Sequence, residues 1–423
     1  MAHHRRGIMA RFVAARRSGY TALAAFLAIL GPGLLAGLSD DDPAGITTYS
    51  LLGAEHGYTL LWIIPLSTAL LVQFHLLAVR IGAATGQGFV AVIRSRWGRG
   101  WGYAAAVLLV IANFGTICAE YAGVAAAGSL IGIPAWLSAP LAALLIATVI
   151  ILGSFHRVEQ VLLVVSSTLA LYVIDGIMAE PSWGHVFRGT TIPTLPTGAA
   201  GWVAISAALG TTLAPWGLAF IQSYAVDRQI TRASLRYARW DVIVGSILTG
   251  VIGLAVAVAC AATLHPAGIR IDDAADVAAA LRPLAGAAAT LLFGTGLLGA
   301  SLLAAAIVPV ATAYSLAEAA AVPASLGLDG RHFQWFYAAF VVLVAAAAGI
   351  VSLPGLPLIP LIYMSQVVNA LVLPLHLAVL VRLGADASLL GDAISPPWVT
   401  RAGWASVALT VACIAALAWS WWQ

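Results

Sequence analysis

The chain has 423 residues, of which 61% are hydrophobic and 9% are charged, and its formal net charge is +3. That share of apolar side chains exceeds what one soluble core buries, so the composition excludes an ordinary soluble protein and indicates an all-α polytopic membrane protein. The small net charge gives no reason to expect a nucleic-acid partner. The three cysteines, Cys118, Cys260 and Cys413, lie in apolar stretches and lack metal-ligand spacing.

Eleven segments are apolar and long enough to cross about 30 Å of hydrocarbon as helices. In chain order they cover residues 28–55, 59–80, 102–128, 135–153, 160–178, 202–225, 240–263, 285–320, 333–352, 357–381 and 401–421. They divide the chain into a basic cytoplasmic segment (1–27), a first five-helix repeat (28–178), an extracellular loop (179–201), a second five-helix repeat (202–381), and a linker with an eleventh helix (382–423). A lipid bilayer is the environment that these segments require.

The arginines set the expected orientation, because all 20 basic residues are arginines. With the N-terminus in the cytoplasm, only Arg188, Arg270 and Arg282 fall on the outer side, and the other 17 fall inside. Positive charge concentrates on the cytoplasmic side of membrane proteins. We therefore expect a multi-pass protein of the cell membrane with a cytoplasmic N-terminus and an extracellular C-terminus.

The first apolar segment contains three consecutive carboxylates, Asp40, Asp41 and Asp42, followed by Pro43. Charges at membrane depth are costly unless they face protein or water, and a proline interrupts a helix. This pattern predicts a broken first helix beside an ion pathway. In the alternative interpretation, residues 21–39 alone cross the membrane and the aspartates are solvated in an outer loop.

The sixth segment carries a second interruption, Gly210-Thr211-Thr212-Leu213-Ala214-Pro215-Trp216. This segment is the first helix of the second five-helix half, just as the segment with the aspartates is the first helix of the first half. Two interrupted helices at matched positions are typical of an inverted-repeat transporter whose site lies near the middle of the membrane. A plain proline kink is the alternative for this segment.

Several motifs resemble the Nramp family of divalent-metal transporters. Gly31-Pro32-Gly33-Leu34-Leu35 followed by Asp42-Pro43-Ala44-Gly45 is similar to the family's first helix, whose motif reads Asp-Pro-Gly-Asn. Similarity continues through Leu60-Leu61-Trp62, Gln73 and residues 80–86 to residues 209–216, where the family has Met-Pro-His, and to Ser365-Gln366 and Leu373-Pro374 in the tenth helix. The resemblance implies a LeuT-like fold of eleven helices, a 5+5 inverted repeat with helices 1 and 6 broken.

The resemblance also implies a metal site with altered ligands. Asp42 keeps the family's metal-binding aspartate, whereas Gly45 replaces its asparagine ligand and Ala214 its methionine. The backbone carbonyl of Thr211 and the side chain of Gln366 match groups that contact the ion. Asn369 lies one turn from Gln366 on the same helix face, where it can join the site.

A site without the thioether offers only oxygen donors, and such donors suit Mg²⁺ or Mn²⁺. The smaller Gly45 and Ala214 side chains also leave room for a partly hydrated ion. These substitutions resemble the Nramp-related magnesium transporter branch. We therefore expect an importer of divalent cations that is not an enzyme and uses no cofactor; no particular oligomeric state is indicated.

Proton coupling in the family depends on a histidine after the helix 6 proline and on an acidic pair in helix 3. Here Trp216 takes the histidine position, and Glu120 remains while Ile117 replaces its acidic partner. We expect transport without proton coupling, with Glu120 either beside the aqueous path or buried as a structural acid. Asp40 and Asp41 either attract the incoming cation or cap the helix break.

Two other functions fit the same sequence. One is a proton-coupled importer of transition metals, and the other is a LeuT-fold transporter of an organic solute, because a fold hosts many substrates. A substrate carboxylate would be repelled by Asp42, which disfavours the second. An enzyme is the least favoured reading, because no nucleophile motif or phosphate-binding loop is recognisable.

Overall fold

The computed structural model describes residues 42–152, 171–230, 235–280, 286–322 and 334–422, and within these ranges the regular structure is entirely helical. The first half contains α4 (Pro43–His56), α5 (Ile63–Thr85), α6 (Phe89–Trp97), α7 (Arg99–Ser129), α8 (Ala135–Ile151), α10 (Leu171–Met178) and α11 (Trp183–Thr191). The second half contains α12 (Ala199–Thr212), α13 (Pro215–Asp227), α14 (Leu235–Ala267), α15 (Ala274–Ala279), α17 (Ala289–Ala320), α18 (Gln334–Val351), α19 (Leu358–Gly384), α20 (Ala387–Leu390) and α21 (Pro397–Trp422), with short 3-10 turns at Gly286–Ala288 and Gly391–Ala393.

Each of the eleven predicted segments contains a helix, with α12 and α13 sharing the sixth. Seven helical stretches in the described ranges are apolar and long enough to cross a membrane, and two shorter apolar helices, α8 and α18, accompany them. The prediction of a polytopic helical protein is therefore confirmed. The basic segment 1–27, Asp40, Asp41 and the beginnings of helices 1 and 5 lie outside the described residues.

Four short helices in the described ranges, α6, α11, α15 and α20, were not predicted. Each is too short to cross the hydrocarbon, so a search for long apolar segments passes over it. Helix α11 lies inside the predicted loop 179–201, and α6 connects the second and third membrane helices. The second helix also runs about one turn further than predicted, to Thr85, where Gly86 ends it in the left-handed conformation.

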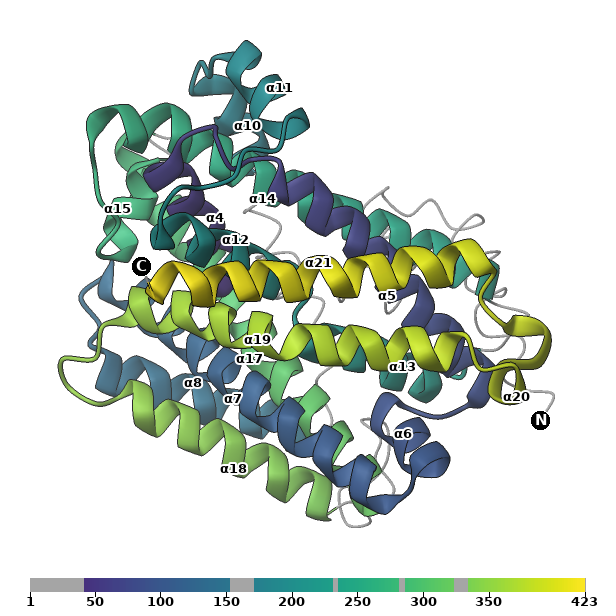
Figure 1. The fold of residues 1–423 in the computed structure, drawn as a ribbon. Coiled ribbons are helices and arrows are strands. Elements are labelled where there is room, and N and C mark those ends of the chain that lie inside the picture. The colour runs from purple at the N-terminus through teal and green to yellow at the C-terminus, as the bar shows by residue number, and fades with distance from the viewer. Residues whose placement is uncertain (1–41, 153–170, 231–234, 281–285, 323–333, 423) are drawn as a thin grey trace, which may run out of the picture.

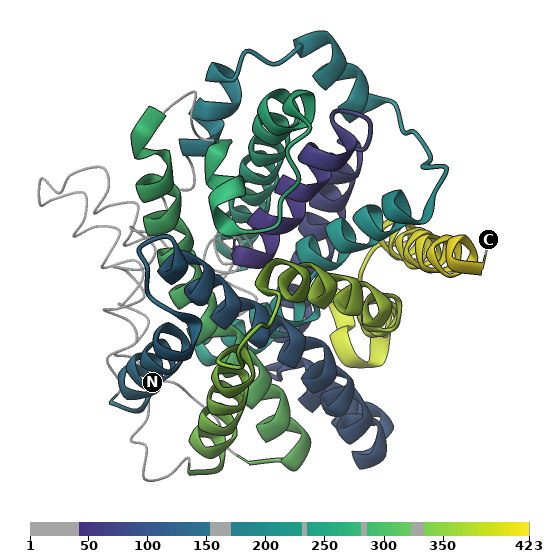
Figure 2. The ribbon, with the colours of Figure 1, turned by 90° about the vertical axis from the view of Figure 1, so that its left-hand side faces the viewer.

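Helix α7 is the centre of the packing, because it contacts α17, α19, α6, α8 and α18. Helix α4 packs against α14 and α12, and α12 in turn packs against α19. Helix α21 runs alongside α19 in Figure 1 and lies at the edge of the molecule in Figure 2. Segments from both halves of the chain therefore surround the beginning of α4.

A half-buried carboxylate connects three of these elements. Glu318, near the end of α17, accepts hydrogen bonds from the backbone N–H groups of Val90 (2.9 Å) and Ala91 (3.2 Å) in the first turn of α6. Its other oxygen accepts a bond from the hydroxyl of Ser223 in α13, 2.6 Å away. A negative charge at a helix N-terminus is stabilised by the free N–H groups and the helix dipole. Glu318 therefore caps α6 from a distant part of the chain.

We expect Glu318→Ala to lower the free energy of unfolding by about 2–4 kcal/mol, because hydrogen bonds to a charged group contribute strongly and their buried donors would lose a partner. Thermal unfolding of the detergent-solubilised protein measures the loss. Glu318→Gln is the matched control, since its amide oxygen still accepts from α6 and its NH₂ group donates to Ser223. Equal stability of the alanine variant and the parent would contradict this role.

Candidate functional site

Asp42 is the N-cap of α4, and its position follows directly from the local sequence. Its Oδ1 accepts a hydrogen bond from the N–H of Gly45 (2.7 Å), and Pro43 occupies the first helical position. Aspartate before proline is a favoured helix start, because the carboxylate satisfies a free N–H and proline has none to satisfy. The side chain is buried, 4% exposed. A carboxylate is thus held at the beginning of a buried helix by its own backbone.

The sixth membrane segment is broken between α12 and α13, as predicted. Helix α12 ends at Thr212 and α13 begins at Pro215, leaving Leu213 and Ala214 in a non-helical link. In a continuous helix the carbonyl of Thr211 would accept from residue 215, but Pro215 has no N–H. The Thr211 carbonyl is therefore available to another partner.

Three contacts hold this break against α4, α5 and α19. The hydroxyl of Thr212 lies 2.7 Å from that of Tyr49 in α4 and 3.0 Å from that of Ser67 in α5. On the other side, a Cβ atom at Gly210 would lie 1.9 Å from the carbonyl oxygen of Gln366. Only glycine permits this approach of α12 to α19. The predicted residues Thr211 and Gln366 are consequently on adjoining elements.

The structure also brings Asp42 and Glu120 together. Pro43 packs directly on α7 at Gly123, where a Cβ atom would lie 2.3 Å from its ring, and Glu120 is one turn earlier on α7. The side chain of Glu120 is fully buried and interacts with the carboxyl group of Asp42; apart from Asp42, its oxygens have no hydrogen-bond partner in the described part of the chain. Two buried carboxylates repel each other when both are ionised, and a cation relieves that repulsion.

Gln366 and Asn369, predicted to share a helix face, are hydrogen-bonded to each other. The Nδ2 of Asn369 donates to Oε1 of Gln366 and to Oγ1 of Thr116 in α7, with both distances 2.9 Å. Thr116 is one turn from Glu120 on the same helix. The amides of α19 are thereby joined to the helix that carries Glu120, and all of these side chains are buried.

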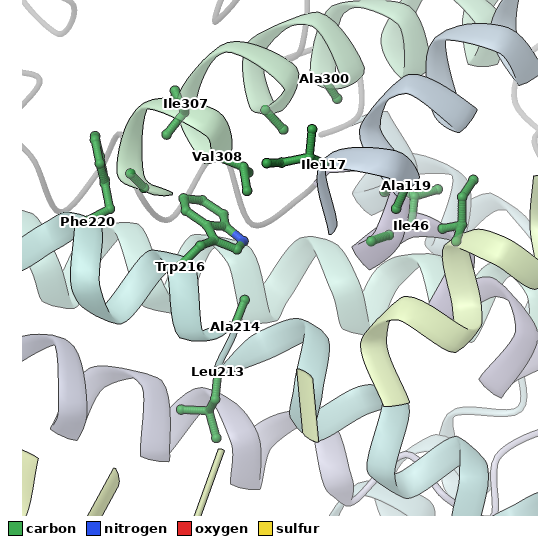
Figure 3. Packing of buried hydrophobic residues seen from close by; sticks show 14 of the residues in the cluster. Ile46, Ile117, Ala119, Leu213, Ala214, Trp216, Phe220, Ala300, Ile307 and Val308 are labelled. Atoms are coloured by element: carbon green, nitrogen blue, oxygen red, sulfur yellow. The ribbon is translucent and has the colours of Figure 1, made fainter. Parts of the chain in front are cut away.

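The two positions where the resemblance would place protonatable groups, 117 and 216, carry apolar side chains. Figure 3 shows Ala214 on the link between α12 and α13, with the Trp216 indole and Ile117 both projecting toward Val308 of α17. Trp216 and Ile117 are buried members of one hydrophobic cluster. Neither side chain can accept a proton at physiological pH.

Soft metal ligands do not converge on this region. Met364 precedes Gln366 by two residues but is 42% exposed, so its thioether points away from the buried amides. Among the described residues no group of three or more histidine, cysteine, aspartate or glutamate side chains is arranged to hold a metal ion. Any cation bound here would meet mainly carboxylate, amide and carbonyl oxygens.

The sequence interpretation gave no role in the site to three polar residues of this region: Asn113, Thr116, and Ser365, which it named only in the tenth-helix match. Asn113 donates to Thr312 of α17 at 2.9 Å, and Ser365 accepts from Gln366 at 2.7 Å. A signal for two of them was present, because Asn113, Thr116 and Glu120 recur at the spacing of one face in an otherwise apolar helix. Ser365 carries no such pattern.

Comparisons with known proteins identify the family. The profile of the family described as "Natural resistance-associated macrophage protein-like" (Nramp) matches residues 33–420. The divalent metal cation transporter MntH of Klebsiella pneumoniae is 29% identical over 395 residues, which are 91% of this chain and 92% of that protein.

Two solved structures share the fold. A manganese transporter of Eremococcus coleocola has a TM-score of 0.74 at 22% identity and covers 95% of this chain and 88% of its own. Mhp1, a nucleobase-cation-symport-1 family transporter, has a TM-score of 0.56 at 14% identity, with 92% and 93% covered. The expected LeuT-like architecture is thus confirmed, and the family match extends over nearly the whole chain. The chain belongs to the Nramp family.

Proposed function

We propose that the chain imports divalent metal cations, Mg²⁺ or Mn²⁺, as partly hydrated ions and without proton coupling. One observation carries the proposal: the buried carboxyl groups of Asp42 and Glu120 interact with each other, and the Thr211 carbonyl has lost its helical partner because Pro215 has no N–H. Hard oxygen donors suit these two ions, and Mg²⁺ usually keeps several of its waters. The names of similar proteins, a divalent metal cation transporter and a manganese transporter, support the substrate class.

The site residues have distinct roles in this proposal. Asp42 supplies the charge that binds the ion, and the Thr211 carbonyl, Gln366 and Asn369 supply neutral oxygens. Gly45 and Ala214 contribute space in place of side-chain ligands. Glu120 lies along the aqueous path as the second charge. Asp40 and Asp41 remain proposed contacts of the entering cation.

The absence of coupling is supported by Trp216 and Ile117, which replace the family's proton-accepting groups. With a cytoplasmic N-terminus and an inside-negative potential, entry of a divalent cation is favoured by about 4.6 kcal/mol per 100 mV, twice the value for one charge. The membrane potential is sufficient to drive import. The competing function is proton-coupled transition-metal import, in which the Asp42 and Glu120 pair would carry the proton.

Purified protein in liposomes distinguishes the two functions. We expect uptake of Mg²⁺ and Mn²⁺ that responds to an inside-negative potential, with no acidification of the lumen as the metal enters. The measurement uses a metal-sensitive dye and a pH-sensitive dye inside the same vesicles. Protein-free vesicles with the same potential are the control. Proton entry in step with metal entry would replace this proposal with the coupled one.

A further inference from the structure

The amide groups of α19 are held in a single orientation by a chain of hydrogen bonds that begins at a helix carbonyl. The hydroxyl of Ser365 donates to the carbonyl oxygen of Ile362 at 2.6 Å. A hydroxyl has only one hydrogen, so toward Gln366 the oxygen of Ser365 must accept. Nε2 of Gln366 lies 2.7 Å from it and donates. The backbone carbonyl of Ile362 thereby fixes the orientation of the Gln366 amide, with Nε2 facing Ser365.

The orientation passes from Gln366 to Asn369. Because Nε2 of Gln366 faces Ser365, its Oε1 faces Asn369 and accepts from Nδ2 at 2.9 Å. Turning the Asn369 amide around would place two acceptor oxygens against each other. Oδ1 of Asn369 is left buried with no hydrogen-bond partner among the described residues. The free atom of this amide is therefore an acceptor.

A hydroxyl group on α17 orients a second amide in the same way. Thr312 donates its hydroxyl hydrogen to the carbonyl of Val308 at 2.9 Å, so it accepts from Nδ2 of Asn113 at 2.9 Å. Oδ1 of Asn113 is likewise buried and without a partner in the described ranges. Asn113 lies two turns, about 10 Å, before Glu120 on one face of α7.

The atoms that these two amides leave free are both acceptors: the Oδ1 atoms of Asn113 and Asn369. A buried acceptor without a donor is unfavourable, so a ligand that supplies donors is bound there preferentially. The water molecules around a divalent cation direct their hydrogens outward and form a shell of donors. The two amide oxygens are complementary to that shell and disfavour an anion beside them.

We propose that Ser365 and Thr312 are positioning residues that orient the two asparagine amides, and that Asn113 is a second contact for the hydrated cation along α7. This inference rests on the proposed function, since it assigns how that cation's water shell is recognised. It adds a contact beyond the predicted ligands and gives a role to two hydroxyl groups that touch no metal.

Cobalt(III) hexaammine tests this proposal, because its ammine ligands do not exchange and present donors as a hydrated Mg²⁺ ion does. Its binding to the purified full-length protein is measured by calorimetry, which requires no transport. We expect Ser365→Ala and Thr312→Val each to weaken this binding about 10-fold, the lower end of losses for residues that orient a metal site. Ser365→Thr and Thr312→Ser should restore it.

Ser315→Ala is the matched control, since the Ser315 hydroxyl donates to the carbonyl of Ala311 in α17 and orients no amide among the described residues. Unchanged binding of cobalt hexaammine in Ser365→Ala and Thr312→Val would overturn the proposal. An equal loss of binding in Ser365→Ala and Ser365→Thr would also overturn it, because it would indicate an effect of packing alone. Mg²⁺ uptake into liposomes is recorded separately. If the parent protein binds cobalt hexaammine, and the variants weaken that binding, but no Mg²⁺ enters the liposomes, the proposed transport function is refuted and this inference is not.

Discussion

Asp42→Asn is expected to reduce Mg²⁺ uptake by at least about 100-fold, because residues that merely orient a metal ligand already contribute 10- to 100-fold to affinity. The substitution removes the charge that is buried beside Glu120 at the start of α4. It leaves the helix start intact, since asparagine caps a helix about as well as aspartate and can still accept from Gly45. Loss of transport would therefore reflect the missing charge.

The measurement compares the initial Mg²⁺ uptake rates of the parent protein and the variant in liposomes. Thermal unfolding of the same preparations shows whether the variant is folded. Asp42→Ala is the second variant, and it should lose transport and also about 1 kcal/mol of helix capping. Transport by Asp42→Asn at the rate of the parent protein would contradict the assignment of Asp42 as the charged ligand.

Ala214→Met is expected to shift the preference of the protein toward soft metals. Ala214 lies on the non-helical link between α12 and α13, three residues after Thr211, at the position where the resemblance places a methionine ligand. Sulfur ligands select softer transition metals over hard cations. We expect the ratio of Cd²⁺ to Mg²⁺ uptake to rise by about 10-fold or more, the scale on which a change in the ligand environment alters metal affinity.

Ala214→Leu separates the chemistry of sulfur from its bulk. Both variants place a larger side chain in a buried position, and overpacking of this kind costs about 1–3 kcal/mol. Leucine should lower uptake of both ions without favouring Cd²⁺. Competition uptake in liposomes, with both ions present, gives the ratio directly. An unchanged ratio in Ala214→Met, or the same change in Ala214→Leu, would contradict a hard-ligand site at this link.

Local features of the sequence determined the helices and their interruptions. Apolar segments of sufficient length predict membrane helices because every backbone polar group must be bonded within the hydrocarbon. Asp42 before Pro43 predicts a helix start, and Pro215 predicts the break after α12, because both effects depend only on neighbouring backbone groups. Short helices such as α6 and α11 were not predicted, because a segment too short to cross the hydrocarbon carries no such length signal.

Only the tertiary structure decided which polar groups meet. The pairing of Asp42 with Glu120, the contact of Asn369 with Thr116, and the capping of α6 by Glu318 each join distant helices. Such contacts are long-range choices, and an apolar helix pattern does not specify its neighbours. The direction of each amide is likewise set by a hydrogen-bond chain that starts at a helix carbonyl, as at Ser365. Sequence therefore determined the kinds of ligands, whereas the fold decided which atoms are left free.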